Sequence, residues 1–280
     1  MKLKISSPVV TANWLHDNIK SENLIVLDAT ITKIGTEKNT QKEKQQIPNA
    51  VFFDLKKVFL NKEGQYPNTV PSEKVFEVEV QKLGIHKDSC IVVYDDIGVY
   101  SSPRAWWLFK LFGFENVAVL NGGLPAWKAE GFLVEKQGKN SFIKGSFKTN
   151  YQKNSIIDTN GVLKAVISKE YEILDARSHD RFHAIVPEPR KDLRGGHIPT
   201  SKSLPFTQVQ NGVKMKTKEE LIKLLAEKNP ENKELIFSCG SGITACVLAL
   251  ACEITANKNY RVYDGSWTEW ASKLELPIEK

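Results

Sequence analysis

Residues 235–252 read LIFSCGSGITACVLALAC. The first four residues are typical of a short buried strand, and Gly240 and Gly242 then interrupt the pattern. The apolar run that follows is too long for another strand and indicates a buried helix. The stretch therefore predicts a strand, a tight loop and a helix, with Cys239 at the first position after the strand.

This position favours a reactive thiolate at Cys239. A free thiol has a pKa of about 8.5, and a helix N-terminus or nearby cations lower it. Backbone N–H groups of a glycine-containing loop also stabilise negative charge, and they would hold a persulfide in the same way. The alternative is an inert buried cysteine, as we expect for Cys246 and Cys252. The loop with two glycines favours the reactive interpretation.

The segment Cys239–Cys246 resembles the active-site loop of tandem-domain sulfurtransferases, the rhodanese superfamily. It is most similar to the 3-mercaptopyruvate sulfurtransferase branch, whose loop reads Cys-Gly-Ser/Thr-Gly-Val-Thr. Thiosulfate sulfurtransferases of the vertebrate type carry charged residues at the first two positions after the cysteine. The resemblance implies that Cys239 is catalytic and that the active-site loop consists of Gly240, Ser241, Gly242, Ile243 and Thr244, with Ile243 replacing the usual valine.

The order of motifs in the first half of the chain returns in the second half at nearly constant separation, which indicates duplication. The matching landmarks are Asp28 and Asp175, Pro48 and Pro199, Asp95 and Cys239, and Trp127 and Trp270. Uniformly apolar strands alternate with helical segments, so each half predicts an α/β fold with a mainly parallel sheet flanked by helices.

We therefore predict two tandem rhodanese-like domains. Residues 1–137 form a non-catalytic domain, residues 138–150 a polar linker, and residues 151–280 the catalytic domain. The first domain has Asp95 in the nucleophile's place, so it cannot perform the same chemistry.

Two arginines lie in the segment RFHAIVPEPR, residues 181–190. This segment is similar to the family motif Arg-Phe-x-Gly…Pro-Glu-Pro-Arg, with Ala184 where glycine is frequent. The resemblance implies that Arg181 and Arg190 bind the carboxylate and keto group of the substrate, which suits the planar guanidinium. The alternative is that both are solvated arginines with partners such as Glu188.

Ser241 offers a hydroxyl to the sulfur or the substrate. In the resembling family this serine belongs to a proton relay with a histidine and an aspartate of the first domain. The family sequence His-Ile-Pro-Gly-Ala reads Gln46-Ile47-Pro48-Asn49-Ala50 here, so we expect that histidine to be missing at Gln46. A neutral amide cannot act as a general base.

Three other features of the second half are expected to be structural. Asp175 and Arg177 predict a buried polar tie at a strand end, and His197 predicts a structural hydrogen bond. The tryptophans, of which Trp270 is one, are expected in the cores.

The overall composition sets further limits. The formal charge of +6 comes with lysines spread along 280 residues, which favours a solvated surface over a nucleic-acid or membrane site and suits a small anionic substrate. Four cysteines show neither a disulfide framework nor a metal-binding spacing. We expect no metal, no cofactor, no apolar signal segment and a cytoplasmic location.

The sequence thus predicts a sulfurtransferase that moves sulfur from 3-mercaptopyruvate through a Cys239 persulfide to a thiol or cyanide, releasing pyruvate. The predicted partners are a small-molecule sulfur donor and a thiol acceptor, such as a small thiol or a thioredoxin-like protein. Two alternatives are a thiosulfate sulfurtransferase and a persulfide carrier without steady-state turnover. A cysteine phosphatase is disfavoured because Ala245 stands where such an enzyme needs an arginine.

Overall fold

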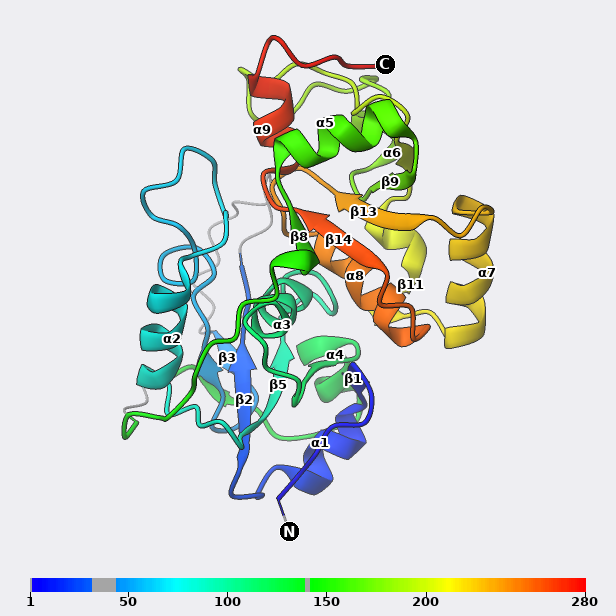
Figure 1. Cartoon of the computed structure of the whole chain (residues 1–280). Helices are drawn as coiled ribbons and strands as arrows, with labels where there is room; N and C mark the ends of the chain where they lie inside the picture. The colour runs from blue at the N-terminus through cyan, green and yellow to red at the C-terminus, as the bar shows by residue number, and fades with distance from the viewer. Residues whose placement is uncertain (1, 32–43, 139–141) are drawn as a thin grey trace. The chain divides into compact units, whose positions relative to one another are not determined.

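The computed structural model describes residues 2–31, 44–138 and 142–280 (Figure 1). It separates into two compact units. Unit 1 comprises residues 1–62, 70–152 and 212–215, and unit 2 comprises residues 63–69, 153–211 and 216–280. The predicted domain boundaries remain a prediction, and residues 139–141 of the predicted linker lie outside the described residues.

Unit 1 is built on a five-stranded parallel sheet with the order β1-β6-β5-β2-β4. Its strands are β1 (Val9–Val10), β2 (Leu24–Asp28), β4 (Val51–Phe52), β5 (Cys90–Tyr94) and β6 (Val117–Leu120). Its helices are α1 (Ala12–Asn18), α2 (Glu73–Lys82), α3 (Ser102–Leu111) and α4 (Gly123–Ala129). A short antiparallel pair joins β3 (Gln45–Gln46) to β7 (Glu135–Lys136).

Unit 2 repeats this arrangement, with the strand order β10-β9-β13-β14-β8 and parallel pairing throughout. Its strands are β8 (Ile156–Ile157), β9 (Tyr171–Asp175), β10 (Lys202–Ser203), β13 (Glu234–Ser238) and β14 (Tyr260–Tyr263). Its helices are α5 (Thr159–Ser168), α6 (His179–Phe182), α7 (Lys218–Lys228), α8 (Ala245–Ile254) and α9 (Ser266–Ser272), with 3₁₀ turns at Lys153–Ser155 and Phe206–Val209. Two short strands remain, β11 (Gln210–Asn211) in unit 2 and β12 (Lys214–Met215), whose residues belong to unit 1.

The two sheets are equivalent strand by strand. Reading unit 2 from its β8 edge, β8, β14, β13, β9 and β10 occupy the places of β1, β6, β5, β2 and β4. This equivalence confirms the predicted duplication and the predicted α/β class, with two parallel sheets flanked by helices.

Helix starts follow the capping signals in the sequence. The Thr11 hydroxyl accepts a hydrogen bond from the backbone N–H of Trp14 at 3.1 Å and begins α1. Thr217 and Glu220 form a reciprocal capping box at the start of α7. Each such cap stabilises a helix by about 1 kcal/mol.

Unit 2 forms a sheet covered on both faces, as Figure 1 shows for α5 and α9 on one side and α7 and α8 on the other. Residues Ala245 through Cys252 of α8 are all fully buried, which explains why this helix lacks a polar face. The opposite face packs Ile236 against Trp267 and Trp270 of α9. Burial on both faces accounts for the continuous apolar pattern of β13.

The segment that follows residue 141 belongs to unit 1, although its composition is polar. Phe147 is fully buried and contacts Phe76 and Phe109. Backbone hydrogen bonds from Gly145 to Gln81 and from Asn150 to Phe112 fasten the segment along its length. One buried aromatic ring therefore anchors a stretch whose other residues resemble a linker.

None of the helices in the described ranges is long and apolar enough to cross a lipid bilayer.

Candidate active site

Cys239 lies at the carboxyl end of a central strand. Strand β13 ends at Ser238, and α8 begins at Ala245, so residues 239–244 form the loop between them. The predicted strand, loop and helix are thus confirmed. In open parallel sheets ligands bind beyond the carboxyl ends of the strands, which is where this loop lies.

The Cys239 sulfur is enclosed by backbone and hydroxyl groups, and the residue is only 1% exposed. The Gly242 N–H donates a hydrogen bond to Cys239 Sγ at 3.1 Å. The Ser266 hydroxyl lies 3.8 Å from Sγ and accepts the Cys239 N–H at 3.2 Å. These groups form a polar cradle around the sulfur, of the kind that stabilises a thiolate.

Ser266 was not identified by the sequence analysis. It adopts a left-handed conformation with φ of +50° although it is not glycine, and it is fully buried. The pairing of β13 with β14 brings the turn after Tyr263 beside the loop. The position of Ser266 shortly after the neighbouring strand β14 could have indicated its role, because the carboxyl ends of parallel strands lie at the same edge of a sheet.

The two loop glycines serve different needs. Gly242 has φ of +78°, a conformation that side chains disfavour. Gly240 has no such φ, but an added Cβ would lie 3.1 Å from Arg181 Nη2. Gly240 is therefore small because the guanidinium of Arg181 packs against it.

Arg181 is held by a buried carboxylate. Its Nη2 lies 2.5 Å from Glu188 Oε2, and its Nε donates to Oε1 at 3.3 Å. Glu188 also accepts a hydrogen bond from Arg177 at 2.9 Å. The predicted alternative, a pairing of an arginine with Glu188, thus holds for Arg181, and this pairing fixes the guanidinium beside the loop.

Arg190 has different surroundings. Its Nη1 donates to the Thr268 hydroxyl at 3.0 Å, and no carboxylate among the described residues pairs with it. Thr268 in turn donates from its hydroxyl and its backbone N–H to the Gly240 carbonyl. Burial, and then the charge of Arg181, lower the pKa of Arg190, whereas Glu188 and Cys239 act in the opposite direction. Arg190 is therefore a half-buried cation, close to the loop, with capacity for an anion.

The predicted polar tie below the loop is confirmed. The Arg177 guanidinium is completely buried and binds Asp175 through Nε and Nη2 at 2.9 and 2.7 Å. His197 is also structural as expected, since its Nδ1 lies 3.1 Å from the Phe182 carbonyl and its ring stacks on Phe182. Burial lowers the pKa of His197.

Gln46 stands at the position where we expected the histidine of the resembling family to be missing. Its side chain belongs to unit 1 and donates to Glu135 at 2.7 Å. The residue at Ser241 is Asn68, whose Nδ2 lies 2.8 Å from Ser241 Oγ. The sequence analysis did not identify Asn68. Nothing in the local pattern distinguishes this asparagine from others in loops.

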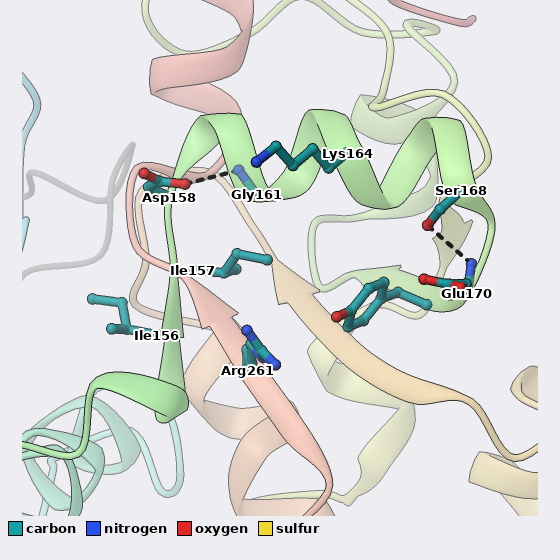
Figure 2. Close-up of a pocket in the computed structure, with 9 residues that line it drawn as sticks. Ile156, Ile157, Asp158, Gly161, Lys164, Ser168, Glu170 and Arg261 are labelled. Atoms are coloured by element: carbon teal, nitrogen blue, oxygen red, sulfur yellow. Dashed lines mark hydrogen bonds between the residues drawn. The ribbon is translucent and has the colours of Figure 1, made fainter.

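A separate cavity of about 580 Å³ lies between α5 and the β8 edge of the unit 2 sheet (Figure 2). Tyr171 and Arg261 line it, near the amino ends of β9 and β14, and Arg261 is already paired with Glu234. Its position and its mixed charges separate it from Cys239. Among the described residues there is no cluster of histidine, cysteine, aspartate and glutamate fit to hold a metal ion.

Comparison with known proteins agrees with this geometry. Residues 11–130 and 159–273 each match the family model described as "Rhodanese-like domain". The chain is 37% identical to Thiosulfate/3-mercaptopyruvate sulfurtransferase 1, mitochondrial, of Arabidopsis thaliana, over 98% of this chain and 78% of that one. It is 35% identical to 3-mercaptopyruvate sulfurtransferase of Escherichia coli K12, over 96% of this chain and 97% of that one.

A solved structure gives the same result. The crystal structure of SseA from Escherichia coli, described with the "Rhodanese" fold of 3-mercaptopyruvate sulfotransferases, superposes with a TM-score of 0.84 at 33% identity, covering 94% of this chain and 99% of that one. Two family matches, full-length sequence similarity and a shared fold lead to one conclusion: the chain belongs to the rhodanese family, with two rhodanese-like domains in tandem.

Proposed function

We propose that this sulfurtransferase of the rhodanese family takes sulfur from 3-mercaptopyruvate, holds it as a persulfide on Cys239, and passes it to a thiol or cyanide. Relatives that are named 3-mercaptopyruvate sulfurtransferases and match nearly the whole chain support the reaction class and the donor. The uncharged Gly240 and Ser241 beside the nucleophile support a donor that needs no cation at those positions.

The observation that carries the choice of donor is Arg190. It is a guanidinium near Cys239 with a hydroxyl partner and no paired carboxylate in the described chain. Such a group binds a carboxylate through two parallel, charge-assisted hydrogen bonds. In this proposal Arg190 holds the carboxylate of mercaptopyruvate. Arg181, fixed by Glu188, contacts the neighbouring keto oxygen.

The first step forms an S–S bond and breaks a C–S bond. The Cys239 thiolate attacks the thiol sulfur of mercaptopyruvate, and the electron pair of the C–S bond leaves on carbon as the enolate of pyruvate, which then takes up a proton. The arginines stabilise the negative charge that develops on the enolate. The loop residues Gly240, Ser241, Gly242, Ile243 and Thr244 hold the persulfide through backbone N–H groups.

The second step returns the enzyme to its starting state. A thiolate acceptor attacks the outer sulfur, the S–S bond breaks, and the electron pair returns to Cys239 as the thiolate. With cyanide as acceptor the product is thiocyanate. A small thiol or a thioredoxin-like protein is the proposed acceptor. This two-step covalent scheme predicts ping-pong kinetics.

Two alternatives are tested by the same experiment. Thiosulfate is a candidate donor because the name of the Arabidopsis relative includes it. A persulfide carrier would accept sulfur once and release no pyruvate in the steady state.

The experiment measures pyruvate release from mercaptopyruvate, thiocyanate formation from thiosulfate with cyanide, and the intact mass of the protein after exposure to each donor alone. Wild type should gain one sulfur atom from mercaptopyruvate and turn over, and Cys239→Ser should do neither. Retained transfer from both donors in Cys239→Ser would exclude the persulfide on this residue. Faster turnover with thiosulfate would overturn the proposed donor.

A reducing compartment, with the cytoplasm as the proposed location, suits this chemistry because the active form is a thiol. All four cysteines are free and buried. A relative named as mitochondrial makes the mitochondrion the alternative to test by localisation.

A further inference from the structure

Asn68 contacts the active-site loop although 173 positions separate it from Ser241. It belongs to residues 63–69, which pack within unit 2. Asn68 is 5% exposed and has φ of +63°, a left-handed conformation that asparagine tolerates better than most residues. The Thr69 hydroxyl donates to the Tyr66 carbonyl at 3.3 Å and braces the turn. A buried amide is thus held against the loop.

The orientation of this amide follows from its two partners. Asn68 Nδ2 lies 3.2 Å from the Ser241 carbonyl oxygen and 2.8 Å from Ser241 Oγ. A carbonyl oxygen only accepts hydrogen bonds, so the atom facing it must be the NH₂ group. The same NH₂ group therefore donates to Ser241 Oγ. The Ser241 hydroxyl accepts from Asn68 and must direct its own proton away from it.

The second hydroxyl at the site, that of Ser266, is less available to donate a hydrogen bond to the sulfur or the substrate. Ser266 Oγ lies 2.8 Å from the Tyr263 carbonyl, which competes with Cys239 Sγ at 3.8 Å for its proton, and it accepts the Cys239 N–H. The Ser241 hydroxyl, two residues after the nucleophile, differs from that of Ser266. Asn68 directs its proton, and no carbonyl of the described structure accepts that proton.

We propose that Asn68 is a positioning residue that makes Ser241 a fixed hydrogen-bond donor to the reacting sulfur or substrate. An amide neither gains nor loses a proton in the working pH range, so Asn68 and Ser241 supply a hydrogen bond and not a proton relay. This inference rests on the proposed sulfur transfer at Cys239. It assigns the orientation of the hydroxyl to a residue that is distant in sequence.

A double-mutant cycle tests whether Asn68 acts through Ser241. The proteins are wild type, Asn68→Ala, Ser241→Ala and the double variant, and the readout is kcat/KM for pyruvate release from mercaptopyruvate. Loss of one neutral hydrogen bond predicts a decrease of about three- to tenfold in Asn68→Ala. In the Ser241→Ala background the same change should cost nothing further. Multiplicative losses would overturn the proposal.

A pH profile separates positioning from simple packing. In Asn68→Asp the ionised carboxylate accepts the Ser241 proton and reverses the hydrogen bond, whereas the protonated acid restores a donor. The activity ratio of Asn68→Asp to wild type should therefore rise as pH falls through the pKa of the new carboxyl group. The ionisable groups near the loop, Cys239, Arg181, Glu188, Arg190 and Tyr66, are present in both proteins, so a pH dependence of the ratio originates from the new carboxyl group and its effect on them.

Asn116→Asp is the matched control, because the Asn116 amide also donates to carbonyls, those of Leu3 and Ser89, but lies in unit 1. Its activity ratio to wild type should not vary with pH. A pH-independent ratio for Asn68→Asp would overturn the proposal. If wild type itself gains no sulfur on Cys239, the proposed function fails instead, and the mass measurement distinguishes the two outcomes.

Discussion

Asp95 in unit 1 and Cys239 in unit 2 occupy the same place at the end of equivalent strands, β5 and β13. The Asp95 carboxylate is 1% exposed and accepts five backbone hydrogen bonds, from residues 97, 98, 100, 101 and 102, together with one from the Ser102 hydroxyl. At Cys239, Gly242 donates from the position that matches Gly98.

The difference between Asp95 and Cys239 indicates the role of the loop in each unit. In both units the loop surrounds a group that bears, or can bear, negative charge. In unit 1 that group is a permanent carboxylate of the protein, so the cradle is filled and contributes to stability. In unit 2 it is a sulfur that, in the proposed function, accepts a second sulfur and releases it. One loop architecture thus serves as a structural clamp in unit 1 and, in the proposed function, supports covalent chemistry in unit 2.

The turn beside each loop differs accordingly. Gly123 in unit 1 has φ of +54°, and an added Cβ would clash with the carbonyls of Asp95 and Gly98. Its equivalent in unit 2, Ser266, keeps nearly the same φ of +50° but carries a hydroxyl that contacts the nucleophile. The unit 2 turn therefore tolerates strain at a residue that touches Cys239.

The largest expected effect comes from giving unit 2 the residue of unit 1. Cys239→Asp should reduce sulfur transfer by at least about a thousandfold, because a carboxylate cannot form a persulfide. The loop N–H groups should donate hydrogen bonds to the carboxylate, so the thermal midpoint should stay within a few degrees of that of wild type. Activity assays and calorimetry check both parts, with Cys239→Ser as control. Gross unfolding of Cys239→Asp would refute the idea of a shared anion cradle.

Emptying the unit 1 cradle should affect stability. Asp95→Ala leaves several buried N–H groups without an acceptor, and we expect a loss of about 3–5 kcal/mol in the free energy of unfolding. Asp95→Asn should cost less, since its remaining oxygen still accepts. Urea unfolding followed by tryptophan fluorescence measures both values. Equal stability of Asp95→Ala and wild type would contradict a structural role for the clamp.

The next prediction concerns the arginines beside the unit 2 loop, which have a proposed role in binding the substrate. Arg190→Ala should lower kcat/KM for mercaptopyruvate by about ten- to hundredfold, because a charge-assisted bidentate contact is lost. Thiosulfate, which has no carboxylate, should be affected less, and Arg190→Lys should recover only part of the activity. Equal losses with both donors would mean that Arg190 acts on Cys239 or on the fold.

Position 240 gives a smaller effect. Its equivalent in unit 1, Asp96, carries an exposed side chain, whereas Gly240 lies against Arg181. Gly240→Ala should displace the guanidinium slightly and reduce kcat/KM for mercaptopyruvate by about fivefold, with little change in thermal midpoint. Asp96→Ala is the matched control and should leave both quantities unchanged. A Gly240→Ala enzyme with wild-type activity would show that Arg181 need not hold its place.

The smallest effect concerns Cys90, the buried cysteine at the start of strand β5 in unit 1. Burial raises the pKa of Cys90 to about 11. Because the folded state holds the neutral thiol, its contribution to stability is complete below the unfolded pKa of about 8.5 and is lost as pH rises toward 11. Replacing Cys90 by alanine should flatten the decline in stability over this range in urea titrations. At neutral pH, iodoacetamide should label Cys239 before Cys90, and the reverse order would contradict the reactive loop.

Local sequence was sufficient for much of the fold. Apolar runs, glycines and capping residues specify strands, turns and helix starts within a few positions, so β13, the loop after it and α8 were predictable. The repeated order of landmarks predicted two equivalent sheets. The location of Cys239 at a strand end followed from the same local pattern.

Tertiary structure alone decided how the site is completed. Asn68 at Ser241, Thr268 on Arg190 and Arg181 over Gly240 are contacts between segments that the local pattern treats as separate. The polar role of a side chain depends on which group faces it, and that is set by the packing of whole elements. The local sequence around a loop asparagine therefore does not predict which group it contacts. The local sequence around Cys239, between a buried strand and two glycines, predicts most of its surroundings.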